Sequence, residues 1–290
     1  MPVKLSAASL ASLPAGIARP SYTRADITPG IVHFGVGNFH RAHQAVYLDE
    51  LFNSGRSRDF GIVGAGVLSF DAAARERMAA QDFLTTVVEQ DEAGMSARVT
   101  APMAGFLDPA DRAAMVAALA DPAIRIVSLT ITEGGYFLDA AGRFSPDPPD
   151  IRHDAANPGD PRTVFGIILA SLRRRRAEGA TPFTVMCCDN IPGNGHVTEG
   201  VMTGLAALAD RDFAAWIEGE VAFPNSMVDR ITPATTDRER QILAERFGVE
   251  DNWPVFCEPF RQWVLEDRFP AGRPALEEVG VTFVSDVAPF

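Results

Sequence analysis

The sequence predicts an α/β fold in which a doubly wound, mostly parallel sheet carries helices on both faces. Strand-like and helix-like segments alternate from residue 31 onward, which is typical of this class. Several of the strand-like runs are apolar throughout, as in strands that are buried on both faces. The first run leads directly into two closely spaced glycines, at a place where such domains turn from strand into helix.

The strands are expected where Val, Ile and Phe gather in short runs. IVHF, FGIVGAG and FLTTVVE open the series, and IRIVSLTI and FTVMCC continue it. The predicted strands are residues 31–34, 60–66, 83–89, 124–131, 183–188, 221–228 and 281–287.

Helices are expected between these runs, at residues 41–54, 71–80, 109–120, 163–178, 197–218 and 237–247. Asp108 precedes Pro109, which predicts an N-cap followed by proline at the first helical position. Four arginines, 173–176, follow the apolar stretch VFGIILASL and are expected to end a helix, where cations suit the dipole. Residues 139–162 are rich in Pro, Asp and Gly and predict a loop.

The length of 290 residues suits one large domain or two small ones. Hydrophobic residues make up 47% and charged residues 22%, which is ordinary for a globular protein. We expect residues 1–30 to form a lead-in, with a short helix and a loop, and residues 31–290 to form a single domain.

The charge balance excludes some classes of partner. With 26 basic and 38 acidic side chains the formal charge is −12, so a nucleic-acid partner is not expected. No apolar run approaches the roughly 18 residues of a membrane span, so no membrane partner is expected either. Cys187, Cys188 and Cys257 lack CxxC spacing, which predicts neither a zinc site nor a disulfide framework and suits a cytoplasmic location.

The stretch IVHFGVGNFHRAHQ, residues 31–44, is a candidate dinucleotide-binding turn. Gly35 would allow the tight turn, and Gly37 would let a diphosphate approach the backbone at a helix N-terminus. Asn38 or Arg41 could add hydrogen bonds to phosphate. The usual third glycine is missing, and an ordinary strand-to-helix turn remains the alternative.

Asp71 follows the second predicted strand and is a candidate for the adenosine ribose. A carboxylate there can accept hydrogen bonds from both ribose hydroxyls, which favours NAD over NADP. The alternative is that Asp71 caps a helix that begins at Ala72.

The five histidines give no metal signature. His40 and His43 share one helix face, but no third ligand is evident, so a packing or phosphate-side role is expected and no metal.

Five motifs occur in order: GVGNFHRAHQ, TITEGGY, CCDNIPGNG, FPNSMVDRITP and WPVFCEPFRQWVLED. Together they resemble the polyol-specific long-chain dehydrogenases, a family that includes mannitol 2-dehydrogenase, arabinitol 4-dehydrogenase and the fructuronate and tagaturonate reductases. The resemblance covers residue 25 to the end. It implies a zinc-independent, NAD-dependent oxidoreductase with an N-terminal Rossmann-type domain. The reaction would interconvert a polyol and a ketose of the mannitol/fructose type by hydride transfer, and the full-length form would be a monomer.

The resemblance also implies roles for single residues. Asn190 matches an asparagine that donates to the reacting oxygen, and Asp229 matches a position that binds substrate hydroxyls. Glu133 would lie near the nicotinamide ribose. The implied cofactor-binding set is Gly35, Val36, Gly37, Asn38, Phe39, Arg41, Asp71, Thr132, Glu133 and Asn190.

Each of these matches has a structural alternative. Asn190 could form a turn before Pro192, and Glu133 could be a cap or a surface carboxylate. Asp229 could form a structural pair with Arg230 or another cation. Phe70 replaces a family glutamate beside Asp71, so discrimination against NADP should weaken, with NAD still preferred.

The family's catalytic lysine lies in a Lys-x4-Asn-x2-His pattern that does not occur in these 290 residues. We therefore expect the helical C-terminal domain of the family to be absent from this chain, which resembles the cofactor domain of a longer enzyme. Two alternatives follow from the sequence: a reductase for uronates, and a non-catalytic NAD-binding module.

Overall fold

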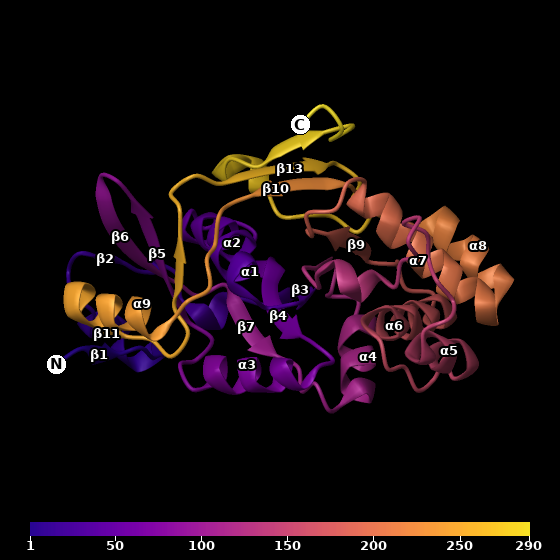
Figure 1. Cartoon of the computed structure of the whole chain (residues 1–290), viewed down its shortest axis with the longest axis horizontal. Coiled ribbons are helices and arrows are strands. Elements are labelled where there is room, and N and C mark those ends of the chain that lie inside the picture. Colours follow the sequence, from indigo (N-terminus) through magenta and orange to yellow (C-terminus); the bar gives the residue numbers. More distant parts are fainter.

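Five parallel strands form the central sheet of the computed structural model, which describes residues 1–290 (Figure 1). The observed fold confirms the predicted α/β class with a mostly parallel sheet. In spatial order the strands are β7 (Met103–Phe106), β4 (Gly61–Ala65), β3 (Pro29–Phe34), β8 (Ile126–Leu129) and β9 (Thr184–Cys187). Of these five strands, the one that comes first along the chain, β3, lies in the middle of the sheet, between β4 and β8.

Successive residues of these strands point into two separate cores, which explains their continuous apolar runs. Ile31 of β3 and Met186 of β9 belong to one core, whereas Val32 and Val185 belong to the other. The second core is covered by α4 (Arg112–Ala120), α6 (Val164–Glu178) and α7 (Asn194–Ala209). Figure 1 shows these helices gathered with α5 (Pro149–Ala156) and α8 (Arg211–Glu220) on one side of the molecule.

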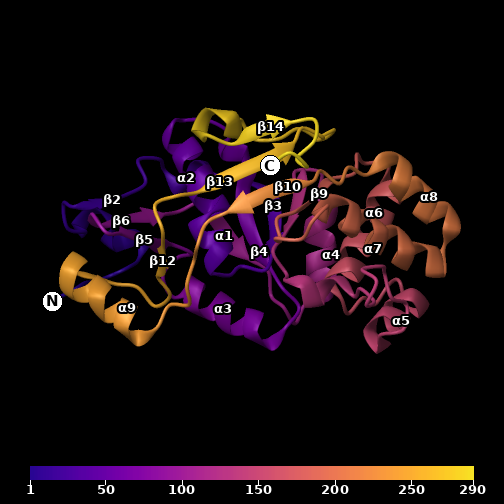
Figure 2. The same cartoon turned by 45° about the horizontal axis from the view of Figure 1, so that its top comes forward.

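The first core is covered by helix α2 (Gln44–Asn53), which follows the short helix α1 (Asn38–Ala42), and by the C-terminal segment. That segment forms a small sheet, in which β13 (Gln262–Glu266) lies between antiparallel β10 (Ser226–Asp229) and parallel β14 (Thr282–Val284). Figure 2 shows this sheet lying over α1 and α2.

A separate sheet of four strands contains a hairpin that the sequence did not indicate. Strands β5 (Thr85–Asp91) and β6 (Gly94–Thr100) pair antiparallel, and β12 (Val255–Cys257) and β2 (Ile17–Ala18) flank them. Residues 1–30 are drawn into the fold as well: β1 (Val3–Lys4) pairs with β11 (Val249–Glu250), and Leu5 and Leu13 are buried in the first core.

Several predicted boundaries were wrong. The predicted helix 197–218 breaks at Asp210, whose side chain accepts from the Phe213 amide and starts α8. The predicted helix 109–120 begins at Arg112, and its N-cap is Asp111 rather than Asp108. The predicted strand 221–228 starts only at Ser226, and the predicted loop 139–162 contains α5.

Other boundaries were closer. The arginines 173–176 lie in the last turns of α6, as predicted, and Gly179 ends that helix. The predicted helix 41–54 is interrupted at His43, the predicted helix 71–80 is α3 (Ser69–Ala79), and the predicted helix 237–247 is α9 (Asp237–Ile242) followed by one π-helical turn.

Candidate functional site

The glycine turn joins β3 to α1 and has the backbone that its sequence requires. Gly35 has a φ of +94°, and a Cβ there would lie 2.0 Å from the Thr130 carbonyl oxygen, so no other residue fits. Gly37 is the N-cap of α1, with its amide donating to the Gly35 carbonyl at 2.7 Å. A Cβ on Gly37 would meet only the Gly35 oxygen, at 3.8 Å, so this side of the turn is open to a ligand.

The polar side chains that follow the turn, Asn38 and Arg41, form hydrogen bonds to other protein groups. The buried Arg41 guanidinium stacks 3.8 Å from the Trp253 ring and donates to the Trp253 carbonyl and to Asn38 Oδ1. The Asn38 amide nitrogen donates to the Pro233 carbonyl at 3.0 Å. Arg41 therefore ties α1 to Trp253, a contact that the sequence did not indicate. Val36 is buried, and Phe39 is half-buried and stacks on His43.

Three buried histidines lie directly beneath the turn. His33 bonds to Ser128 Oγ at 2.8 Å and stacks on His40, with ring centroids 3.7 Å apart. His43 Nε2 bonds to the Gln262 carbonyl at 2.8 Å. Burial lowers the pKa of His33 and of His43 to about 3, and that of His40 well below its usual value. These rings serve packing, and no cluster of three His, Cys, Asp or Glu side chains that could hold a metal ion occurs in the structure.

Asp71 is the third residue of α3, so a helix beginning at Ala72 was the wrong register. Its carboxylate accepts from the Leu68 amide at 2.8 Å and packs on Gly66, where a Cβ would lie 2.1 Å from Asp71 Cγ. Burial raises the pKa of the Asp71 carboxyl. The side chain thus supports the turn after β4, while its neighbour Phe70 is 54% exposed.

An open pocket of about 450 Å³ lies where β8 and β9 end. Because these strands are parallel neighbours in the sheet, the segments that follow them meet at the same edge, one strand away from the glycine turn. Three sequence-predicted residues meet in this pocket. Its lining is Thr132, Glu133, Gly134, Asp189, Asn190 and Ile191.

Asp189 is a pocket residue that the sequence reasoning missed. Its carboxylate accepts from the amides of Ile131 and Thr132, both at 2.9 Å, and from the Tyr136 hydroxyl at 2.6 Å. Burial raises the pKa of this carboxyl. The only available signal was its position next to Asn190, since its partners lie more than 50 residues away in sequence.

Asp229 ends β10 and is exposed. The alternative in which it pairs with Arg230 is wrong, because the buried Arg230 guanidinium instead contacts Glu89 at 2.6 Å and the Ala42 carbonyl at 2.6 Å. Asp229 therefore remains available to a ligand.

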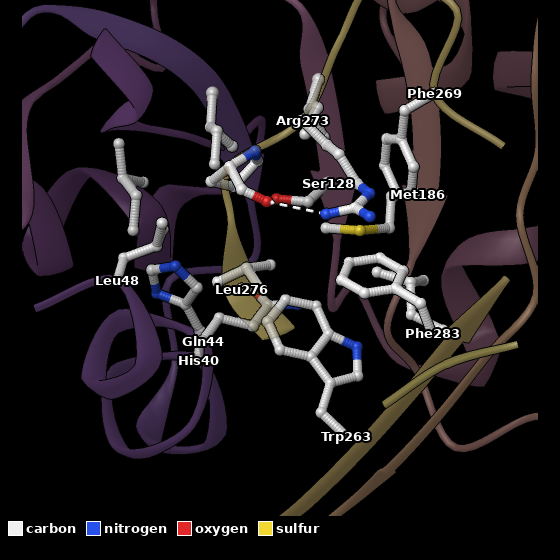
Figure 3. Close-up of a pocket in the computed structure, with 15 residues that line it drawn as sticks. His40, Gln44, Leu48, Ser128, Met186, Trp263, Phe269, Arg273, Leu276 and Phe283 are labelled. Atoms are coloured by element: carbon white, nitrogen blue, oxygen red, sulfur yellow. Dashed lines mark hydrogen bonds between the residues drawn. The ribbon is translucent and has the colours of Figure 1, made fainter. Parts of the chain in front are cut away.

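A second hollow, drawn in Figure 3, lies inside the first core and does not suit a nucleotide. It lies between α1–α2, one face of the central sheet and the C-terminal segment, and most of its lining is apolar. Figure 3 shows His40 and Gln44 on one side and Arg273 and Phe283 on another. Its volume of about 10 Å³ would admit little more than one water molecule.

The turn and the open pocket together fit a dinucleotide. The turn offers a helix N-terminus and an uncrowded glycine for a diphosphate, and the pocket offers polar groups one and two strands further along the same edge. None of the helices is long and apolar enough to cross a membrane.

Comparison with known proteins agrees with this geometry. A family model described as the mannitol dehydrogenase Rossmann domain matches residues 29–278. The chain is 62% identical, over 93% of its length, to a mannitol 2-dehydrogenase of Cereibacter sphaeroides, and 46% identical, over 99% of its length, to one of Pyricularia oryzae. It spans 57% and 59% of these relatives.

Two solved structures are similar along nearly the whole chain. One is mannitol 2-dehydrogenase of Pseudomonas fluorescens in a ternary complex with NAD and D-mannitol, with 49% identity and a TM-score of 0.97. The other is a substrate-free D-sorbitol dehydrogenase, with 43% identity and a TM-score of 0.93. The matches cover 99% and 98% of this chain, and 59% of each of those chains.

Proposed function

Because the chain belongs to the mannitol dehydrogenase family, we propose that it is the NAD-binding part of an oxidoreductase that interconverts a polyol and a ketose of the mannitol/fructose type. The similar Pseudomonas fluorescens enzyme was solved with NAD and D-mannitol. Since this chain spans about three fifths of the relatives, the activity of the whole protein is part of the proposal.

The observation that carries the proposal is the alignment of the glycine turn with the open pocket at one edge of the sheet. The turn ends β3, and the pocket lies beyond β8 and β9, its successive neighbours. An extended dinucleotide can lie along such an edge, with its diphosphate at the turn and its nicotinamide at the pocket.

The proposed roles follow from what each group can donate or accept. NAD, when bound, supplies the acceptor for a hydride. Asn190, exposed at the pocket, would donate its side-chain N–H to the reacting oxygen, and Asp229 would accept from substrate hydroxyls. Thr132 and Glu133 would lie beside the nicotinamide ribose, and one oxygen of Asp71 would hold the adenosine ribose.

A titration with both reduced cofactors tests the binding site. We expect NADH to bind this chain more tightly than NADPH, because Asp71 disfavours a second phosphate. Equal affinities would contradict that preference. Phe70→Glu, at an exposed site, should raise the NADH-over-NADPH affinity ratio about ten-fold through charge repulsion. A chain that binds neither cofactor would overturn the proposed function.

Asn190→Ala tests the catalytic role. In the complete reading frame, we expect hydride transfer to slow by on the order of 10²–10³, because one donor to the reacting oxygen is lost. NADH affinity should stay nearly unchanged. A single-turnover measurement separates the two, and an unchanged transfer rate would remove Asn190 from the mechanism.

The substrate class is tested on the same protein with mannitol, sorbitol, arabinitol and fructuronate. Turnover of the polyols is expected, and turnover of fructuronate alone would favour the uronate reductase alternative. We further propose a cytoplasmic location, which the three unpaired cysteines support, and a monomeric full-length form.

A further inference from the structure

One carboxylate joins the two loops that form the open pocket. Asp189 follows β9, and its carboxylate accepts hydrogen bonds from the backbone amides of Ile131 and Thr132, which follow β8. Oδ1 accepts from Thr132, while Oδ2 accepts from Ile131 and from the Tyr136 hydroxyl. With both oxygens engaged by the protein, this side chain acts on the loop rather than on a ligand.

The loop that it holds has a strained backbone. Thr132 has a φ of +65° and a ψ of 161°, a region that is essentially reserved for glycine. Such a conformation persists only where the surroundings enforce it. Asp189 accepts hydrogen bonds from the backbone amides of Thr132 and of the residue before it. These two hydrogen bonds are therefore placed to hold Thr132 in its strained conformation.

The backbone of Asp189 is also held by a hydrogen bond. Its carbonyl accepts from Asn194 Nδ2 at 3.0 Å, and the same buried amide side chain bonds to both the carbonyl and the N–H of Ser226, at 2.8 and 2.9 Å. Ser226 begins β10, which ends at Asp229. The loops after β8 and β9 and the start of β10 are therefore connected through Asp189 and Asn194.

We propose that Asp189 is a positioning residue: it holds the backbone at Ile131–Thr132 in its strained conformation and thereby sets the place of Glu133 opposite Asn190. The inference rests on the proposed function, because it assigns the nicotinamide half of the cofactor to this pocket. The diphosphate half, at the glycine turn, does not depend on it.

Two ligands separate the two halves. NADH occupies both, whereas ADP carries the diphosphate but lacks both the nicotinamide and its ribose, and so reports on the turn alone. In Asp189→Asn the amide group places a donor against a backbone donor, so we expect NADH affinity to fall about ten-fold. The enhanced fluorescence of bound nicotinamide should disappear, and ADP affinity should stay within about two-fold of wild type.

A second substitution tests the mechanism. Glycine adopts a positive φ without cost, so Thr132→Gly in the Asp189→Asn chain should restore most of the lost NADH affinity. Thr132→Gly alone is the reference for this rescue, because it also removes a side chain proposed to lie beside the nicotinamide ribose. In the Thr132→Gly background, Asp189→Asn should lower NADH affinity by less than about two-fold. A direct or purely electrostatic role for Asp189 would give no rescue, and that result would overturn the proposal.

Tyr136→Phe provides a milder variant if Asp189→Asn does not fold. It keeps both hydrogen bonds from the backbone amides and removes the Tyr136 hydroxyl donor, so NADH should bind about three-fold more weakly with ADP affinity unchanged. Equal losses for both ligands in any variant, or an unchanged NADH affinity in all of them, would contradict the positioning role. Failure of the wild-type chain to bind either ligand would instead contradict the proposed function.

Discussion

The two halves of the candidate site are held in different ways. The glycine turn is set by its own backbone: Gly35 lies against the Thr130 carbonyl, and the next glycine opens the helix. The pocket beyond β8 and β9 is set by side chains from distant segments, with Asp189 bonding to Ile131, Thr132 and Tyr136. One half depends on the absence of side-chain atoms, and the other on hydrogen bonds that require particular side chains.

The difference explains why the turn was predicted from its own residues, whereas Thr132, Glu133 and Asn190 in the pocket were assigned roles through the family resemblance. A forced positive φ leaves a local mark in the sequence, a glycine directly after a strand, and this mark was read correctly. Asp189 leaves no such mark, because nothing near it in sequence indicates that amides more than 50 residues away need an acceptor.

The largest expected effect is that of Gly35→Ala, in the half of the site that is set by its backbone. A methyl group at φ +94°, 2.0 Å from a backbone oxygen, should cost about 5 kcal/mol or more, enough to prevent folding. Gly37→Ala is the matched control: its Cβ has open space, so the free energy of unfolding should change by less than about 1 kcal/mol. The control should nevertheless bind NADH at least about ten-fold more weakly, because the methyl group occupies the diphosphate approach.

Urea denaturation of both variants and an NADH titration of the control check this pair. A Gly35→Ala chain of normal stability would show that the turn can relax. A Gly37→Ala chain with unchanged NADH affinity would place the diphosphate elsewhere.

The same contrast extends to the fold. The central parallel strands were predicted because burial on both faces makes them apolar throughout, as in β3 and β8. The hairpin β5–β6 was not, because the second strand, GMSARVT, has a half-exposed, polar start. Its place depends on β12, which comes from more than 150 residues further along the chain. Arg41 likewise looked like a phosphate ligand, and its stacking on Trp253 is visible only in three dimensions.

Acid should weaken the glycine-turn half first. His33, His40 and His43 are neutral in the native state, with pKa values lowered by burial to about 3 for His33 and His43, whereas the unfolded chain binds protons near pH 6.5. Stability from these rings is complete above pH 6.5 and is lost as the pH falls toward 3. Asp49 has the opposite sign: burial raises its pKa to about 6, so its contribution is lost as the pH rises through 6.

Burial also raises the carboxyl pKa of Asp71 and Asp189, which therefore act in the same direction as Asp49. The three histidines are displaced further from their ordinary pKa, so the free energy of unfolding should still fall by about 2 kcal/mol from pH 6.5 to pH 5. Urea denaturation across this range measures the slope. His33→Gln should make it shallower by about one proton. A stability that is flat down to pH 5 would mean that these rings bind protons in the folded state.

The smallest expected loss of stability concerns the N-cap of α4, for which the sequence offers two aspartates. Asp108 and Asp111 both precede α4, and the proline after Asp108 favoured that residue as the cap. In the structure Asp111 accepts from the Ala114 amide at 2.8 Å, whereas Asp108 accepts from Ala110, outside the helix. Asp111→Ala should therefore cost about 1 kcal/mol and Asp108→Ala less than about 0.5 kcal/mol, as measured by urea denaturation. A larger loss of stability for Asp108→Ala than for Asp111→Ala would mean that α4 begins at Pro109, as the sequence predicted. Equal small losses would show that the two carboxylates share the first turn, because either can then satisfy its free amides.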